Sequence, residues 1–107
     1  MADRRSTPRA SVHLQGDTVF VEGALDFDTV SDLDDQLNSW FAGGGDTLHV
    51  DLSGVQFCNS AGISLMLEWM RAARRQGRQL RLQHLPADML AMAELIGLSS
   101  VFVEQPD

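Results

Sequence analysis

The strand-like run at residues 47–52 lies between two segments of helical periodicity, and this order limits the fold more than any other feature. The run is rich in apolar residues, which is typical of a strand buried on both faces of a parallel sheet. Apolar residues recur at helical spacing over residues 29–41 before it, and a second helix is predicted over residues 60–76 after it. The order predicts a central parallel strand joined to its neighbours by crossover helices.

Two short extended runs precede these elements. Residues 11–15 and 18–23 are predicted strands, and Gly16-Asp17 between them is a two-residue hairpin signal. The first ten residues show no periodic apolar pattern and predict a flexible tail.

The carboxyl-terminal third of the chain continues the alternation of strands and helices. We expect a strand at 79–85, a helix at 86–96 with Pro86 in its first position, and a last strand at 101–103. Gly77 and Gly97 are placed to end the second and third helices. The fold class predicted is α/β, a single domain with one mixed sheet and the order β-β-α-β-α-β-α-β.

Composition excludes several classes of function. The 107 residues hold 8 basic and 15 acidic side chains, a net charge of −7, which argues against a general nucleic-acid binder. The single cysteine, Cys58, forbids an internal disulfide, and we expect it to be a small buried side chain rather than a nucleophile. Without a signal peptide or a run of about 18 apolar residues, the chain is expected to be cytoplasmic and not inserted in a membrane.

No motif for catalysis, cofactor or metal binding stands out. The histidines His13, His49 and His84 are far apart on predicted strands and lack ligand spacing. The chain contains no lysine, which excludes a Walker-type phosphate site. The acidic residues between Glu22 and Asp35 lack the spacing of a calcium loop. We therefore expect no metal, no cofactor and no catalysis.

The predicted helix at 60–76 is the most informative segment. We assign its core to the stripe Ile63, Met66, Leu67, Met70 and Ala73. A polar stripe holds Ser64, Glu68, Arg71 and Arg75. A third stripe holds Leu65, Trp69 and Ala72, and Trp69 on it is either additional core or a partner contact. The hydroxyl of Ser60 is expected to cap the helix.

Five arginines follow within residues 71–81. They could serve an anionic lipid or an acidic partner, and a solvated helix end explains them equally well. Direct binding of a lipid or small ligand through these arginines is therefore one hypothesis for the function of the chain.

Several segments together resemble the STAS domain, over about residues 11–104, with a short tail at 105–107. The resemblance is carried by Val50-Asp51-Leu52-Ser53-Gly54-Val55, Phe57-Cys58-Asn59-Ser60-Ala61-Gly62-Ile63, Leu80-Arg81-Leu82 and Leu95-Ile96-Gly97-Leu98. This family includes bacterial anti-sigma factor antagonists and the cytoplasmic STAS subunit of the Mla phospholipid transporter.

The segments Asn59–Arg71 and Leu85–Ala93 are more similar to the transporter subunit. That resemblance implies an adaptor that binds the ATP-binding subunit of an ABC-type phospholipid transporter, and through it the permease, at the inner membrane. The wider complex maintains outer-membrane lipid asymmetry. The expected partner contacts are Asn59, Ser60, Ala61, Ile63, Ser64, Leu65, Glu68 and Trp69.

The alternative is an anti-sigma factor antagonist. In that group the resemblance implies that Ser60 is phosphorylated by a serine kinase that is also the anti-sigma factor. Ser60 is present, whereas Asn59 replaces the usual aspartate and Ala61 replaces the second hydroxyl residue.

Overall fold

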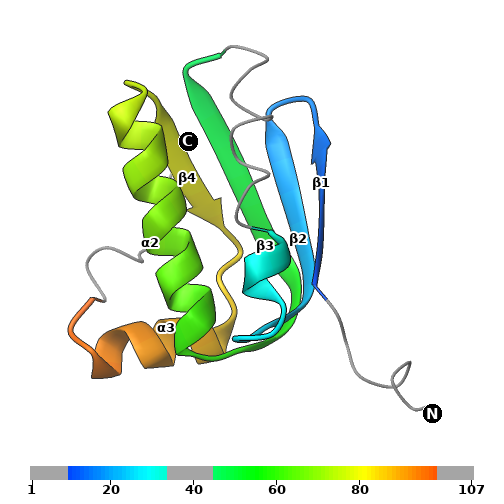
Figure 1. The fold of residues 1–107 in the computed structure, drawn as a ribbon, viewed down its shortest axis with the longest axis vertical. Helices are drawn as coiled ribbons and strands as arrows, with labels where there is room; N and C mark the ends of the chain where they lie inside the picture. The colour runs from blue at the N-terminus through cyan, green and yellow to red at the C-terminus, as the bar shows by residue number, and fades with distance from the viewer. Residues whose placement is uncertain (1–9, 34–44, 99–107) are drawn as a thin grey trace.

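The computed structural model describes residues 10–33 and 45–98, which form an α/β domain. Figure 1 shows the sheet and the long helix α2 beside it. The elements in chain order are β1 (Ser11–Gln15), β2 (Thr18–Leu25), the 3-10 helix η2 (Val30–Asp32), β3 (Thr47–Cys58), α2 (Ser60–Arg75), β4 (Gln79–Gln83) and α3 (Ala87–Leu95).

The sheet has the strand order β1-β2-β3-β4. β1 and β2 are antiparallel and Gln15 pairs with Thr18, which confirms the predicted Gly16-Asp17 hairpin; Gly16 has a φ of 64°. β3 runs parallel to both β2 and β4, which confirms the central parallel strand. The α/β class with one mixed sheet is therefore confirmed.

Several element boundaries differ from the prediction. β3 continues to Cys58 rather than ending at residue 52, and over residues 47–52 its buried residues alternate with half-buried ones. β2 extends to Leu25 because its last residues pair with the end of β3. β4 ends at Gln83, where His84 adopts a φ of 57° that breaks the strand. Pro86 caps α3 rather than opening it.

Some predictions concern residues outside the described ranges. Of the helix expected at 29–41, the structure describes only the start, where η2 is a single 3-10 turn. The strand expected at 101–103 and the tails at 1–9 and 105–107 lie outside the described residues. Ala10, expected in the tail, is half-buried against the core.

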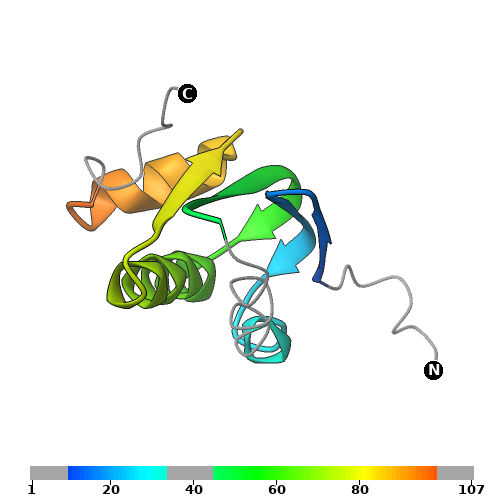
Figure 2. The ribbon, with the colours of Figure 1, turned by 90° about the horizontal axis from the view of Figure 1, so that it is seen from above.

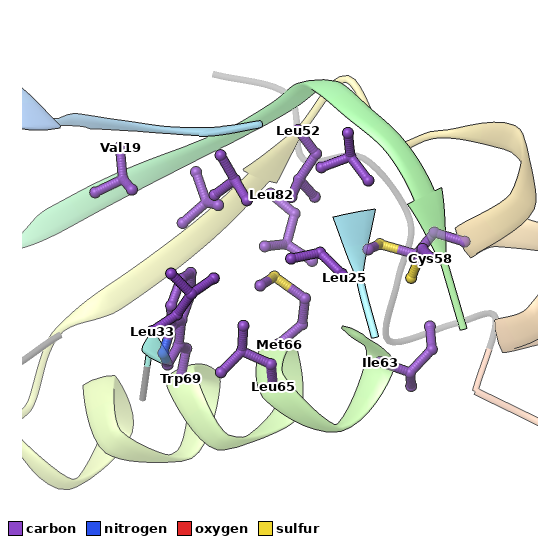
Figure 3. Close-up of a cluster of buried hydrophobic side chains, with 14 of the residues drawn as sticks. Val19, Leu25, Leu33, Leu52, Cys58, Ile63, Leu65, Met66, Trp69 and Leu82 are labelled. Carbon is purple, nitrogen blue, oxygen red and sulfur yellow. The ribbon is translucent and has the colours of Figure 1, made fainter. Parts of the chain in front are cut away.

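α2 covers one face of the sheet. The predicted core stripe is confirmed for Ile63, Met66 and Ala73 and is wrong for Leu67 and Met70. The buried residues of α2 are Ala61, Gly62, Ile63, Leu65, Met66, Trp69 and Ala73, whereas Leu67 and Met70 are only half-buried. Positions 62, 65, 66, 69 and 73 follow the spacing of one helix face. They meet Val19, Val21, Val50, Leu52 and Leu82 from the sheet (Figure 3).

A glycine explains why this face turns toward the sheet. A Cβ atom at Gly62 would lie 2.5 Å from the Cys58 Sγ and 2.9 Å from the Leu25 Cβ. The first turn of α2 therefore approaches the ends of β2 and β3 more closely than any other residue allows. This contact draws the stripe that contains Leu65 and Trp69 into the core.

α3 lies across the amino end of α2 in Figure 1. Seen from above in Figure 2, β4 runs between α2 and α3. Met89 and Ala93 are fully buried and hold α3 against the rest of the domain.

Among the described residues, no helix is both long and apolar enough to cross a membrane.

The Gly62 contact can be tested by substitution with alanine. Helix propensity alone favours alanine over glycine by about 1 kcal/mol, so an open site would gain stability. We expect Gly62→Ala instead to lower the free energy of unfolding by about 1–2 kcal/mol, because the added methyl overpacks a rigid contact. Urea denaturation measures the change.

The matched control is Ser64→Ala, at an exposed position of the same helix, which should leave stability unchanged or slightly raised. A Gly62→Ala protein as stable as the control would show that the first turn of α2 is not closely packed.

Candidate functional site

The carboxyl ends of β2 and β3 bring the loop after β2 next to the start of α2. The Asn59 amide donates a hydrogen bond to the Leu25 carbonyl at 3.1 Å, which continues the parallel pairing beyond the last strand residues. Ligand and partner sites in α/β sheets commonly lie at the carboxyl ends of the strands. This end of the molecule is therefore the first place to look for a functional surface.

Side-chain hydrogen bonds fix the loop after β2. The Asp26 carboxylate accepts hydrogen bonds from the amides of Asp28, at 2.9 Å, and Thr29, at 3.0 Å. The Thr29 hydroxyl donates to the Ala24 carbonyl at 2.7 Å. These bonds define a compact turn, and the turn presents Phe27 to solvent with 71% of the residue exposed.

Asn59, and not Ser60, caps α2. The Asn59 Oδ1 accepts a hydrogen bond from the Ala61 amide at 2.8 Å. Ser60 is the first residue of the helix and is exposed. The prediction that the Ser60 hydroxyl caps the helix is wrong because the preceding asparagine has the extended backbone that an N-cap requires.

A shallow hollow of about 200 Å³ lies between the loop and α2. It is lined by Phe27, Val30, Ala61, Ser64, Leu65 and Glu68. Four of these side chains are apolar, so the hollow suits an apolar side chain. Glu68 forms an ion pair with Arg71, with Oε2 and Nη1 3.1 Å apart, and its single negative charge is thereby partly balanced.

The residues expected to contact a partner divide into two groups. Ser60, Ser64 and Glu68 are exposed and Asn59 is half-buried. The other four are buried: Ala61, Ile63, Leu65 and Trp69. Of the buried residues, Ala61 and Leu65 line the hollow, and Ile63 does not.

Trp69 belongs to the core. It is 2% exposed and packs with Leu33 and Met66 in the buried cluster of Figure 3. Of the two interpretations that the sequence left open for this residue, additional core is the correct one. Its side chain offers no surface in the folded domain.

Phe27 and Val30 are the lining residues that the sequence analysis missed. Both lie in the connection between β2 and β3, far from α2 in the chain. The sequence did contain a signal for Phe27, which lies between two aspartates, Asp26 and Asp28. A large apolar side chain in an acidic loop has no apolar neighbours in the sequence with which to form a core, so it is a candidate for a surface contact.

Cys58 lies directly before the cap and does not have the properties of a nucleophile. Burial, and secondarily the negative charge of Asp88, raise the pKa of the Cys58 thiol from 9.0 to about 11. The Sγ donates a hydrogen bond to the Asn59 carbonyl at 3.3 Å. The expectation that Cys58 is buried is confirmed by its 4% exposure, and a buried thiol with a raised pKa is expected to react slowly.

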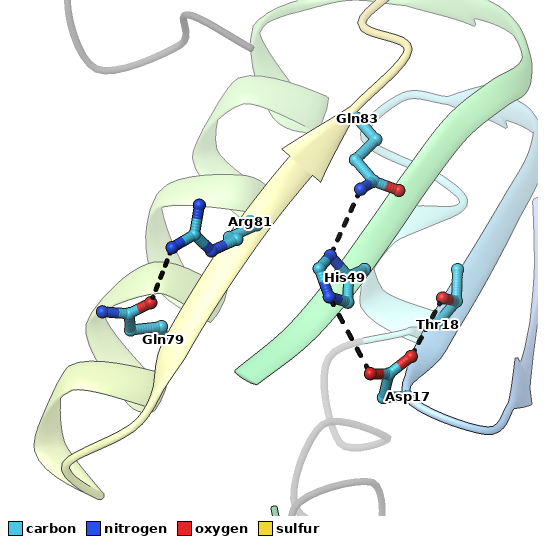
Figure 4. A network of polar contacts seen from close by, with 6 residues as sticks. All are labelled: Asp17, Thr18, His49, Gln79, Arg81 and Gln83. Carbon is cyan, nitrogen blue, oxygen red and sulfur yellow. Dashed lines mark hydrogen bonds and ion pairs between the residues drawn. The ribbon is translucent and has the colours of Figure 1, made fainter. Parts of the chain in front are cut away.

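The face of the sheet turned away from α2 carries polar side chains (Figure 4). His49 lies on β3 between two neighbours. Its Nε2 is 3.8 Å from the Asp17 Oδ2, and its Nδ1 is 3.2 Å from the Gln83 Nε2. These contacts form a short polar chain that links the turn between β1 and β2 to β3 and β4.

Of the other two histidines, His13 lies on β1 as predicted, whereas His84 lies just after β4 and not on a strand. His13 stacks on Phe20 with ring centroids 5.2 Å apart. The His84 Nε2 is 3.9 Å from the Asp51 Oδ2. Within residues 10–33 and 45–98, no group of three or more His, Cys, Asp or Glu side chains could hold a metal ion.

Comparison with known proteins identifies the family of the chain. The sequence model of one family, described as Mlab, STAS domain, matches residues 9–104. No curated protein sequence matches this chain.

Solved structures with the same fold include three from anti-sigma factor antagonists. SpoIIAA in its unphosphorylated form has a TM-score of 0.68 at 17% identity, covering 92% of this chain and 89% of that one. An antagonist from Mycobacterium paratuberculosis also has a TM-score of 0.68, at 20% identity, covering 99% and 92%. The Bacillus cell fate determinant SpoIIAA in its phosphorylated form has a TM-score of 0.63 at 20% identity, covering 92% of each chain. At these identities the likeness shows the fold alone.

The capping assignment predicts opposite results for two neighbouring substitutions. We expect Asn59→Ala to lower the free energy of unfolding by about 1 kcal/mol, because the Ala61 amide loses its acceptor. Ser60→Ala should change stability by less than about 0.5 kcal/mol, because the exposed hydroxyl caps nothing. Urea denaturation of both variants gives the comparison, and a larger loss for Ser60→Ala would reverse the assignment.

The raised pKa predicts a slow reaction of Cys58 with iodoacetamide. With a pKa near 11 in place of 9.0, the native thiol at pH 8 holds about 100-fold less thiolate than the unfolded chain. The native rate should therefore be at least about 100-fold lower, and it should keep rising with pH beyond the point where the unfolded rate levels off. Equal rates for native and unfolded protein would contradict the assignment of Cys58 as buried and protonated.

Proposed function

This chain belongs to the STAS domain family, and from that premise we propose that it is a non-catalytic adaptor of an ABC-type phospholipid transporter. In this role it binds the ATP-binding subunit on the cytoplasmic side and supports the assembly and activity of the complex. The observation that carries the proposal is the family description, Mlab, which matches residues 9–104. The hollow at the amino end of α2 provides the surface that such a role requires.

The shape of this surface supports a binding role. Phe27 projects from a hydrogen-bonded turn, and next to it the hollow is floored by Ala61 and Leu65. Exposed aromatic side chains beside an apolar pocket are typical of the residues that contribute most to protein interfaces. A projecting ring and an adjacent hollow allow two proteins to interlock mainly through apolar contacts, and Glu68, the charged lining residue, is already paired with Arg71.

The polar residues at the rim would set the orientation of the partner. Ser60 and Ser64 are exposed one turn apart on α2, and both hydroxyls can donate and accept hydrogen bonds. Glu68 lies one turn further along and is held by Arg71. An apolar floor with a small number of polar groups at the edge is the usual arrangement of a specific, reversible interface.

A second candidate, an anti-sigma factor antagonist, is favoured by one observation. Ser60 is exposed at the positive end of the α2 dipole, where a phosphate would be stabilised. A phosphoserine there would add a charge of about −1.5 to −2 beside the hollow and would change what can bind. This candidate requires a serine kinase as the partner.

The experiment that separates the two candidates is purification of the tagged chain from its native host in mild detergent. We expect an ATP-binding subunit and a membrane permease to be recovered with it. Recovery of a serine kinase with a sigma factor instead, together with a phosphate on Ser60, would reject the adaptor role.

The surface itself is tested by Phe27→Ser. Because Phe27 is 71% exposed, its loss should leave the stability of the domain nearly unchanged, whereas the amount of ATP-binding subunit recovered should fall about tenfold or more. The matched control is Phe57→Ser, which removes another exposed phenylalanine, 48% exposed, outside the residues that line the hollow. Equal recovery with both variants would show that the hollow is not the contact.

A further inference from the structure

The strand β1 forms one edge of the sheet, and within residues 10–33 and 45–98 only β2 pairs with it. Figures 1 and 2 show β1 at the edge of the sheet, on the side away from α2 and α3. Four of its five residues are exposed, and Val12 is half-buried. The free edge of such a strand presents backbone amides and carbonyls with which a further strand can pair.

This edge lacks the features by which proteins usually prevent edge strands from pairing, which are charged side chains, prolines and bulges. β1 has the sequence Ser-Val-His-Leu-Gln, without a proline, a carboxylate or an arginine. Its five residues pair one to one with β2, without a bulge. The opposite edge strand, β4, carries Arg81 and runs between α2 and α3 (Figure 2). Of the two edges of the described sheet, β1 is therefore the one open to a further strand.

The pairing of β1 with β2 shows which backbone groups face the free edge. Gln15 and Thr18 flank the two-residue turn and pair with each other, and such a flanking pair exchanges both of its hydrogen bonds. In an antiparallel ladder, residues bonded to the neighbouring strand alternate with residues that are not. The backbone amides and carbonyls of Val12 and Leu14 therefore point away from β2.

We propose that β1 is a dimerisation edge, which pairs antiparallel with β1 of a second copy about a two-fold axis through His13. In this register Val12 of each copy lies opposite Leu14 of the other, and each such pair can exchange both of its hydrogen bonds. Pairing about His13 also aligns the full length of the two strands. The strand is thus complementary to itself.

The apolar side chains of β1 favour a second copy as the occupant of this edge. Val12 and Leu14 lie opposite Val21 and Val19, which are fully buried, so they belong to the core face of the sheet. Leu14 is nevertheless 41% exposed, and Val12 of a second copy would cover it. A strand of another protein needs its own apolar pair at this spacing, whereas a second copy supplies it by symmetry.

This edge is separate from the hollow. No residue of β1 lines the hollow, so the pairing of two copies leaves each hollow open and does not depend on the adaptor role. One five-residue strand from each copy makes an interface at the small end of the range for protein pairs. The dimer is therefore expected to be weak.

Sedimentation equilibrium of the intact chain tests the proposal. We expect the average mass to rise from one chain towards two between about 5 and 500 μM. Because His13 meets itself at the two-fold axis, His13→Glu and His13→Arg should each weaken the dimer about tenfold or more through like-charge repulsion. An equimolar mixture of the two variants should restore the dimer, because opposite charges then face each other.

The matched controls are Gln79→Glu and Gln79→Arg, alone and mixed, which introduce the same charges at an exposed position of β4. They should change dimerisation by less than about threefold, because at about 0.15 M salt charges are screened beyond about 8 Å. A mass that stays at one chain throughout would overturn the proposal. So would a dimer that the mixed His13 variants fail to restore, since the copies would then meet elsewhere.

Amide hydrogen exchange separates a second copy from a different partner. The Val12 and Leu14 amides should exchange more slowly as the concentration of the chain rises, because they become bonded to the other copy. Slower exchange of these amides on addition of an ATP-binding subunit, but not at higher concentration of the chain alone, would assign the edge to a different protein and overturn the proposal.

Discussion

The close contact between the first turn of α2 and the ends of β2 and β3 is the feature on which the rest of the domain depends. It exists because Gly62 has no side chain where a Cβ would meet Cys58 and Leu25. The contact sets the rotation of α2, so that Leu65, Met66 and Trp69 enter the core while Ser60, Ser64 and Glu68 stay exposed. One residue thus determines both what stabilises the domain and what the domain presents to a partner.

The same contact leaves the hollow between α2 and the loop after β2. The loop is held by hydrogen bonds from Asp26 and Thr29, and Asn59 caps the helix beside it, so the surface is formed before any partner arrives. A preformed surface loses little conformational entropy on binding. Four of the six side chains that line the hollow are apolar, and Glu68 is the charged one among them.

Local signals predicted most of the fold. The hairpin at Gly16-Asp17, the central parallel strand and the ends of two helices at Gly77 and Gly97 follow from backbone preference and apolar periodicity, and the structure agrees. The site was harder to predict, because it depends on contacts between distant segments. Periodicity alone could not show which stripe of α2 faces the sheet, since Leu65, which is buried, and Leu67, which is half-buried, are the same residue type. Phe27 reaches the hollow only because β2 and β3 end side by side.

Amide hydrogen exchange of the chain, free and mixed with the ATP-binding subunit that the proposed function requires as its partner, tests the central claim most directly. The account predicts slower exchange on binding in two short segments, residues 26–30 and 59–64, because these border the hollow and their amides are at the edge of regular structure. Slower exchange confined to β1 and β4, with both of these segments unchanged, would contradict it.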